Sequence, residues 1–453
     1  MTKRIKLNFV EKNCPILDNP GLWTYPESEA HRHGDLSYWM ELAVLLEQAK
    51  FDGIFLGDAL GTFDTYKGGR DTAILEGISM PIHDPTYLIP AMASVTRHLG
   101  LAVTCSLTYD HPYALARKMS TLDHLTKGRI GWNIVTSNLD SAARNFGYDQ
   151  QIEHDSRYDR GDEFLEVCYK LWEKSWEDGA VVRDIPNRMY TNPAKVHDIA
   201  HKGTYFQVPG IHLCEPSPQR TPVLFQAGSS HRGREFAAKH AECNFLNAVT
   251  VEETRYLIRD VRAKAEKYGR EAGDILFFPR IVPVVGATDE EAQQKIDRYL
   301  QHLSTEGTLA LLSSWTGIDL YGYTPERLYE LIAGKSGGNG YITDYLRRAQ
   351  QDKQWTMEEL ARLYAFGGLG NVIVGSPGRI ADHMESFIQQ TGADGFNLGY
   401  ITRSESVTDF VHQVIPVLQR RGLVQSEYRE GTYREKLFAH QAGLPRSHPG
   451  AQV

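Results

Sequence analysis

The sequence predicts a (β/α)8 barrel, an α/β fold, with two long insertions at about residues 177–215 and 304–372. Strand-like and helix-like segments alternate along the chain, and eight strand-like segments are each followed by a helix-like one. Small polar residues follow nearly every strand-like segment, and in a barrel these strand ends build the active site. A doubly wound open sheet is the alternative arrangement. Residues 1–453 are expected to form one domain.

The strand-like segments are apolar runs rich in β-branched and aromatic residues. Parts of the seventh are poorer strand candidates, because Pro279 and Pro283 cannot donate a hydrogen bond to a β-ladder. In chain order the eight segments are residues 5–10, 51–58, 99–109, 129–137, 222–227, 241–249, 275–286 and 394–400.

The helix-like segments have apolar residues at helical spacing and begin at residues that can cap a helix. Asp35 can cap the first helix, and Thr250 and Thr288 each open a Thr-x-x-Glu capping box. Helices are expected at about residues 35–50, 84–98, 112–128, 160–176, 231 onward, 250 onward, 288–303, 377–390 and 406–421.

Charge, apolar runs and cysteine content argue against several classes of partner and cellular location. The formal net charge of −8 and the lack of basic blocks argue against nucleic acid or anionic membrane as the main partner. No apolar run approaches the roughly 20 residues of a membrane span, and residues 1–13 lack the apolar core of a secretory signal. The five cysteines are scattered and form no C-x-x-C pair, which is typical of a reducing compartment. A cytoplasmic protein is therefore expected.

Residues 222–242, PVLFQAGSSHRGREFAAKHAE, form the most informative segment. A predicted buried strand runs into Gly228, Ser229 and Ser230, and a helix follows. A helix that starts in this way presents unpaired N–H groups and a positive dipole end, which together can bind a phosphate. The alternative is a turn and helix cap that bind no ligand. Polar residues at the other strand ends favour a small, polar, phosphorylated ligand.

Other candidate side chains have two possible interpretations. His154 and Tyr158 are four residues apart, so on a helix they would share a face and could both contact a phosphate. One of Arg232 and Arg234 could also reach the phosphate. The alternative for His154 and Tyr158 is a surface or core position, and for the two arginines it is a solvated charge. Cys14 is either a reactive thiol or a small buried hydrophobe, and its sequence neighbours favour the second. A metal site is not expected, because the sequence has neither H-E-x-x-H nor paired cysteines.

Long stretches of the chain resemble one enzyme family. TLDHLTKGRIGWNIVTS (121–137), EHDSRYDRGDEFLEV (153–167), residues 212–242 and EGTYREKLF (430–438) are similar to the nitrilotriacetate and dibenzothiophene-sulfone monooxygenase family of the bacterial-luciferase-like superfamily. The resemblance runs from about residue 3 to residue 445. Within the family, it is strongest to long-chain alkane and dimethylsulfide monooxygenases.

The resemblance implies a (β/α)8 barrel that takes reduced FMN from a separate NAD(P)H:flavin reductase and reacts it with O2. The substrate would be a small organic molecule that is oxidised or cleaved. Because the flavin carries the chemistry, no triad or metal is required. The catalytic residue is unknown, and Cys14 and Asn138 are the candidates. The FMN-binding residues that the resemblance implies are Asp58, Thr104, Ser137, His154, Tyr158, Ala227, Gly228, Ser229 and Ser230.

The substrate pocket departs from the alkane enzymes, which carry polar residues, several of them histidine, where this chain has others. An aromatic or other apolar substrate with one or two hydrogen-bonding groups is therefore expected, unless these side chains only pack in the top layer of the barrel. The insertion 304–372, with its glycine-rich segment 334–340, is a candidate lid. The substrate-pocket positions are Leu17, Phe63, Ser79, Asn138 and Leu311.

Other functions on the same fold remain open. The alternatives are a riboflavin-degrading flavoenzyme, a flavin-binding protein without oxygenase activity, and a deazaflavin-dependent dehydrogenase. A homo-oligomer, either a dimer or a tetramer, is also expected.

Overall fold

Parallel strands form a closed barrel in the computed structural model, which describes residues 3–247, 250–324, 356–366, 371–439 and 442–453. The ring order is β10-β9-β4-β3-β2-β1-β13-β11, and pairing of β10 with β11 closes it. The (β/α)8 prediction is therefore confirmed, and the open sheet is excluded. The ring strands are β1 (Lys6–Lys12), β2 (Gly53–Gly57), β3 (Gly100–Ser106), β4 (Ile130–Val135), β9 (Val223–Gln226), β10 (Cys243–Leu246), β11 (Leu276–Val285) and β13 (Gly395–Leu398).

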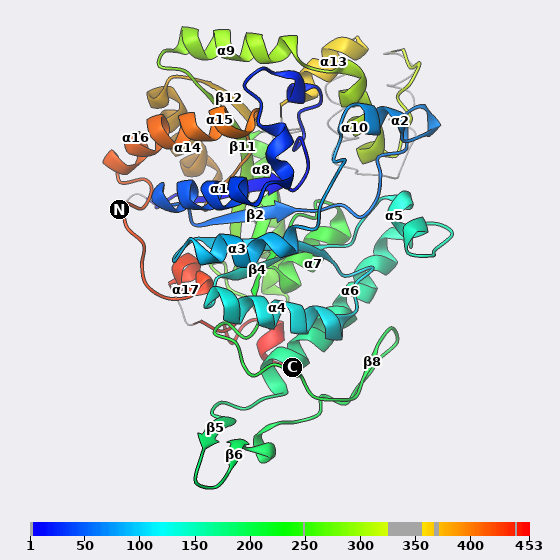
Figure 1. Cartoon of the computed structure of the whole chain (residues 1–453), viewed down its shortest axis with the longest axis vertical. Helices are drawn as coiled ribbons and strands as arrows, with labels where there is room; N and C mark the ends of the chain where they lie inside the picture. The colour runs from blue at the N-terminus through cyan, green and yellow to red at the C-terminus, as the bar shows by residue number, and fades with distance from the viewer. Residues whose placement is uncertain (1–2, 248–249, 325–355, 367–370, 440–441) are drawn as a thin grey trace.

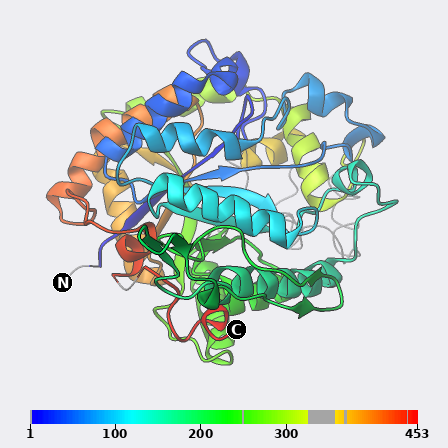
Figure 2. The same ribbon diagram turned by 60° about the horizontal axis from the view of Figure 1, so that its bottom comes forward.

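Helices surround the strands in both ribbon views (Figures 1 and 2). The helices are α1 (Leu36–Gln48), α2 (Asp71–Leu75), α3 (Ile89–Ser94), α4 (Pro112–Thr126), α5 (Asp140–Asn145), α6 (His154–Tyr169), α7 (His231–His240), α8 (Val251–Glu266), α9 (Asp289–Gln301), α10 (Thr305–Thr316), α13 (Met357–Tyr364), α14 (Pro377–Thr391), α15 (Arg403–Asp409), α16 (Ile415–Arg420) and α17 (Tyr433–Phe438).

Two strand predictions need correction. Neither Pro279 nor Pro283 interrupts β11, which runs for ten residues because its partner changes along its length: the first part pairs with β10 and the last with β12 (Asn371–Gly375). Strand β12 was not predicted, since it lies at the end of the expected insertion 304–372. As a short strand at the edge of the sheet, β12 tolerates a proline in its partner.

Two helix predictions also need correction. The helix expected at 84–98 is a 3-10 turn, Pro85–Leu88, followed by the short α3. Helix α6 begins at His154 rather than near residue 160, because the Glu153 carboxylate caps it by accepting a hydrogen bond from the Ser156 N–H. His154 and Tyr158 therefore lie on one helix. The caps predicted at Thr250 and Thr288 are present, since both hydroxyls accept an N–H from the first turn.

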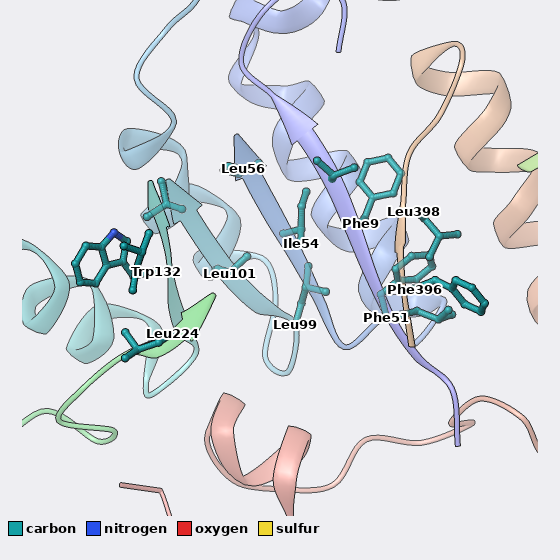
Figure 3. Packing of buried hydrophobic residues seen from close by; sticks show 14 of the residues in the cluster. Phe9, Phe51, Ile54, Leu56, Leu99, Leu101, Trp132, Leu224, Phe396 and Leu398 are labelled. Carbon is teal, nitrogen blue, oxygen red and sulfur yellow. The ribbon is translucent and has the colours of Figure 1, made fainter. Parts of the chain in front are cut away.

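Two apolar layers hold the barrel together. Side chains such as Phe9, Leu56 and Leu398 pack between the strands and the surrounding helices (Figure 3). Inside the barrel, the ring centroid of Phe245 lies 4.9 Å from that of Phe55 and 5.3 Å from that of Phe225. Such stacked aromatic rings stabilise the fold by more than the burial of their apolar area alone.

Helix α17 closes the amino-terminal end of the barrel. Tyr433 enters the interior, where Gly100 makes room for it: a Cβ on Gly100 would lie 2.2 Å from the Tyr433 ring. Arg434 is 1% exposed, and its guanidinium donates to both carboxylate oxygens of Glu242 at 2.7 and 2.9 Å. It also donates to the backbone carbonyls of Gln219, Thr221, Pro222 and Ala442.

The two insertions differ in structure. The insertion at 177–215 contains the hairpin β5–β6 (Val181–Asp184, Met189–Thr191), which projects from the body in Figure 1, and the smaller pair β7–β8 (His201–Lys202, Gln207–Val208). The second insertion contributes α10 and α13. The predicted lid segment 334–340 lies outside the described residues.

Candidate functional site

A cavity of about 690 Å³ lies at the carboxyl ends of β2, β4 and β9. The starts of α6 and α7 and the end of α10 complete its wall. Asn138 also lines it, beside eight of the nine residues predicted to bind FMN, although their role as ligands stays a prediction. Those eight are Asp58, Ser137, His154, Tyr158, Ala227, Gly228, Ser229 and Ser230.

The start of α7 forms one wall of this cavity. The Ser230 hydroxyl caps the helix by accepting the Gly233 N–H at 2.9 Å. A Cβ on Gly228 would lie 2.2 Å from Gln226 Nε2 and 2.9 Å from the Tyr158 hydroxyl. Any side chain at position 228 would therefore have to displace Gln226 or Tyr158, because the Gly228 backbone is packed closely against these polar groups. Binding of a phosphate at this turn stays a prediction.

Arg157 provides a cation that the sequence reasoning missed. Its side chain lines the cavity and is 6% exposed, and within the described part of the chain its Nε and Nη1 atoms have no hydrogen-bond partner. Burial lowers the pKa of this guanidinium. A buried cation without a partner is costly, so the arrangement suits an anionic ligand. The sequence did offer one hint, since Arg157 directly precedes Tyr158, which was predicted to bind FMN.

The other two arginines considered for this role have different partners. Arg232 Nη2 lies 2.6 Å from an Asp162 oxygen, and Arg234 Nε lies 2.5 Å from an Asp260 oxygen. These carboxylates neutralise both guanidinium groups. Arg157 is therefore a better candidate than Arg232 or Arg234 for binding an anion in the cavity.

Ser137 and Thr104 are held by other residues. Ser137 has a left-handed backbone with φ of 51°, and its hydroxyl lies 2.9 Å from the Ser106 hydroxyl. Such a conformation is unfavourable for serine and is often found at functional sites. The Thr104 hydroxyl donates to the Leu56 carbonyl at 2.9 Å and accepts from Asn133 Nδ2 at 3.0 Å. Thr104 is not among the residues that line the cavity.

Asp58 lies where β2 ends, and its Oδ1 accepts the Ala59 N–H at 2.9 Å. Burial raises the pKa of its carboxyl group to about 6, which the Ala59 hydrogen bond only partly offsets. Asp58 can therefore change protonation state near neutral pH. That property suits a group that exchanges protons or hydrogen bonds with a ligand.

Replacing Asp58 by asparagine is expected to raise the free energy of unfolding by about 1–3 kcal/mol at pH 7.5. The folded protein binds this proton more tightly than the unfolded chain, so stability falls as the pH rises from about 4 to about 6. The increase in the free energy of unfolding caused by Asp58→Asn should be markedly smaller at pH 5. Urea unfolding of the ligand-free protein at both pH values measures it, with the exposed Asp149→Asn as control. A gain of equal size at both pH values would contradict the assignment.

Most of the predicted substrate residues are not among those that line this cavity. Leu17, Phe63 and Leu311 are buried in apolar clusters, Phe63 and Leu311 in the one that contains α10. Ser79 is also buried, and its hydroxyl has no hydrogen-bond partner among the described residues. The substrate role of these residues stays a prediction.

Cys14 is buried, and its thiol donates to the Ile16 carbonyl at 2.9 Å. Burial raises the pKa of this thiol to about 12, so it is protonated at neutral pH. A protonated, enclosed thiol is a poor nucleophile. The structure therefore agrees better with a small buried hydrophobe than with a reactive cysteine.

Two further features are absent from the residues that the structure describes. No group of three or more histidine, cysteine, aspartate or glutamate residues in the described segments could hold a metal ion. None of the helices described here has the length and apolar character needed to cross a bilayer.

Comparison with known proteins gives consistent similarities. Residues 19–395 match the luciferase-like monooxygenase family. Over 453 residues, the chain is 50% identical to the long-chain alkane monooxygenase of Geobacillus thermodenitrificans (strain NG80-2), with 100% of this chain and 98% of that protein covered. It is 45% identical to the dimethyl-sulfide monooxygenase of Hyphomicrobium sulfonivorans, covering 100% and 94%. The crystal structure of riboflavin lyase (RcaE) with modified FMN and substrate riboflavin has a TM-score of 0.92 at 36% identity, and 99% of each chain is covered.

Proposed function

Because this chain belongs to the luciferase-like monooxygenase family, we propose that it is the oxygenase of a two-component, FMN-dependent system. It would bind reduced FMN supplied by a separate NAD(P)H:flavin reductase. With O2, it would oxidise or cleave a small, largely apolar or aromatic organic substrate. Arg157 carries this proposal: two of its guanidinium nitrogens have no hydrogen-bond partner among the described residues, and it lines the same cavity as the start of α7. The cavity is large enough for a flavin.

The residues around the cavity fit FMN. Arg157, the Tyr158 hydroxyl and the α7 end with Ser230 would hold the phosphate, since all three line the cavity. Asp58 and Asn138 also line the cavity, where they can exchange hydrogen bonds with the flavin ring or the substrate. Bound reduced FMN would supply the reaction with O2.

The protein's own task is to hold the ligands and keep water away. Trp315 and Gly317, at the end of α10, line the cavity together with Leu60 and Leu139. These groups provide an apolar cover over the polar strand ends. Excluding water protects a reactive oxidant from unproductive decay.

A riboflavin-degrading activity is the second candidate. The similarity to riboflavin lyase favours it, since that structure holds modified FMN and the substrate riboflavin. A flavin-binding protein without oxygenase activity is the alternative from another class. Mass spectrometry of products, with a flavin reductase, NADH and a panel of alkanes, organosulfur compounds, aromatic heterocycles and riboflavin, distinguishes the three.

Rapid mixing tests the oxygenase proposal directly. The protein is loaded with reduced FMN and mixed with O2 in a stopped-flow absorbance instrument. We expect a transient spectrum that belongs to neither reduced nor oxidised FMN. Reoxidation at the rate of free reduced FMN, without such a spectrum, would contradict the proposal.

Replacing Gly228 by valine is expected to weaken FMN binding at least tenfold more than riboflavin binding. The new side chain would displace Gln226 and Tyr158 and block the backbone approach to the phosphate. Loss of one or two charge-assisted hydrogen bonds costs roughly 1.5–3 kcal/mol each. Fluorescence titration of both flavins measures the effect. Gly210→Val is the control, because a Cβ there would meet no atom within 4 Å. Equal weakening of FMN binding and riboflavin binding would show that the turn does not recognise the phosphate.

A further inference from the structure

Three charged side chains meet at the carboxyl end of the barrel, and we call Lys12, Asp18 and Arg280 the mouth cluster. One oxygen of the Asp18 carboxylate lies 3.4 Å from Lys12 Nζ, and the other lies 2.7 Å from Arg280 Nη1. Asp18 thus joins β1 to β11, which are separated by β13 in the sheet. The sequence reasoning missed this cluster because its members are far apart along the chain.

The strand registers show that both cations point into the barrel. Lys12 is the register partner of Gly57, and a Cβ on Gly57 would lie 3.0 Å from Lys12 Cγ, so both face the same side of the sheet. That side is the interior, because Phe55, two residues earlier on β2, stacks on Phe245 there.

Arg280 also faces inward. It lies two residues after Phe278 on β11, and Phe278 belongs to the interior cluster that contains Phe245 and Tyr433. The register partner of Arg280 is Asn397, whose side chain accepts a hydrogen bond from Asn8 Nδ2 at 2.8 Å. The side chains of Lys12 and Arg280 are 17% and 14% exposed.

The mouth cluster carries an excess positive charge. It contains two cations and one carboxylate, and Arg280 Nε and Nη2 have no hydrogen-bond partner in the described part of the chain. Although burial opposes ionisation, Lys12 and Arg280 lower the pKa of Asp18, so Asp18 remains an anion. Asp58 is a further carboxylate at this end, and Lys12 acts on it electrostatically, which lowers the pKa that burial raises. Among the described residues, however, no ion pair within 4.0 Å joins Asp58 to Lys12 or Arg280, whereas Asp18 pairs with both.

The chain has glycine at two positions next to these cations. Gly57 faces Lys12, and a Cβ on Gly399 would lie 3.2 Å from both Nε and Nη2 of Arg280. Burying charges costs several kcal/mol per ion, and apolar side chains of similar size would be as stable or more so. The cluster does not line the cavity itself, but Lys12 contacts Gly57, the residue before Asp58 of the cavity wall. Stability alone therefore does not explain an unbalanced charged cluster at this place.

We propose that Lys12 and Arg280 bind an anionic group of the substrate, either a carboxylate or a sulfonate, at the mouth of the barrel. This inference rests on the proposed function and narrows its substrate class. The substrate is an apolar or aromatic molecule with one negative charge, which matches the single excess positive charge of the cluster. Asp18 orients both cations, and a polyanion would leave further charges buried without a partner.

Matched ligands test the inference on the FMN-loaded protein. Benzoate, benzenesulfonate and octanoate are titrated against the neutral benzamide, benzenesulfonamide and octanamide, and binding is followed by the change in flavin absorbance. We expect at least one anion to bind tenfold more tightly than its neutral counterpart. Lys12→Met and Arg280→Met should each weaken that anion about tenfold and leave the amide unchanged. Arg280→Lys should retain part of the preference. Arg379→Met, on α14 outside the barrel, is the control and should change neither.

Each contrary outcome has a distinct meaning. Equal binding of every anion and its neutral counterpart, or a preference that survives both methionine variants, would overturn the inference. Weaker FMN and riboflavin binding in both variants, without any anion preference in the parent protein, would assign the cations to the flavin ring and also overturn it. If Arg280→Met does not fold, Lys12→Met decides. Failure of the parent protein to bind FMN would instead overturn the proposed function.

Discussion

Replacing Arg157 by methionine is expected to weaken FMN binding about 100-fold while making the FMN-free protein more stable. The buried guanidinium has two nitrogens without partners among the described residues, and the phosphate would satisfy them. Two charge-assisted hydrogen bonds at roughly 1.5–3 kcal/mol each correspond to about 100-fold or more in Kd. Without the ligand, the same charge is unpaired, so its removal should raise the free energy of unfolding by about 1–3 kcal/mol.

The opposite signs of these two effects separate a ligand-binding role from a structural one. Fluorescence titration gives the Kd of FMN and of riboflavin, and urea unfolding gives the stability of the FMN-free protein. Riboflavin, which lacks the phosphate, should bind nearly as before. Arg160→Met is the matched control on α6, because its guanidinium lies over the Phe206 ring instead, 4.6 Å from the centroid. Destabilisation of the FMN-free protein by Arg157→Met would show that the side chain serves the fold.

Replacing Arg434 by methionine is expected to lower the free energy of unfolding by about 3–5 kcal/mol. The change leaves the Glu242 carboxylate buried without its cation and removes the donors to four backbone carbonyls. Urea and thermal unfolding of the ligand-free protein measure the loss. Arg144→Met is the control, since Arg144 forms an exposed pair with Asp64.

A second substitution tests the cause of this loss. In the double variant Arg434→Met with Glu242→Gln, no charge is left unpaired, so about half of the lost stability should return. The carbonyls would still lack their donors. If the double variant is no more stable than Arg434→Met alone, the lost hydrogen bonds explain the effect and the buried carboxylate does not.

The barrel could be predicted because most ring strands are short, largely buried runs that alternate with helix-like segments, and this alternation is visible in one sequence. Strand β12 could not, because NVIVG is short and follows a long segment without regular alternation. Pro279 and Pro283 were also misleading, since a local rule about proline cannot show where a strand changes partners.

In the candidate site too, local sequence patterns could be predicted, whereas burial and contacts between distant residues could not. Gly228, Ser229 and Ser230 stand in a strand–turn–helix pattern whose chemistry can be read locally, and the structure places them on the cavity. Arg157 could not be singled out, because an arginine on a helix is usually solvated and only the fold shows that it is buried without a partner. The mouth cluster depends on contacts between residues 262 positions apart.

The position of α17 has a consequence for biosynthesis. Tyr433 and Arg434 leave the ribosome only after all eight ring strands have been translated, yet they fill the interior and neutralise Glu242. A nascent chain that has exposed the strands alone therefore has an open barrel end and a buried carboxylate without its counterion. The barrel therefore reaches its full stability only after this segment has emerged, because the interior contacts of Tyr433 and the counterion of Glu242 are missing until then.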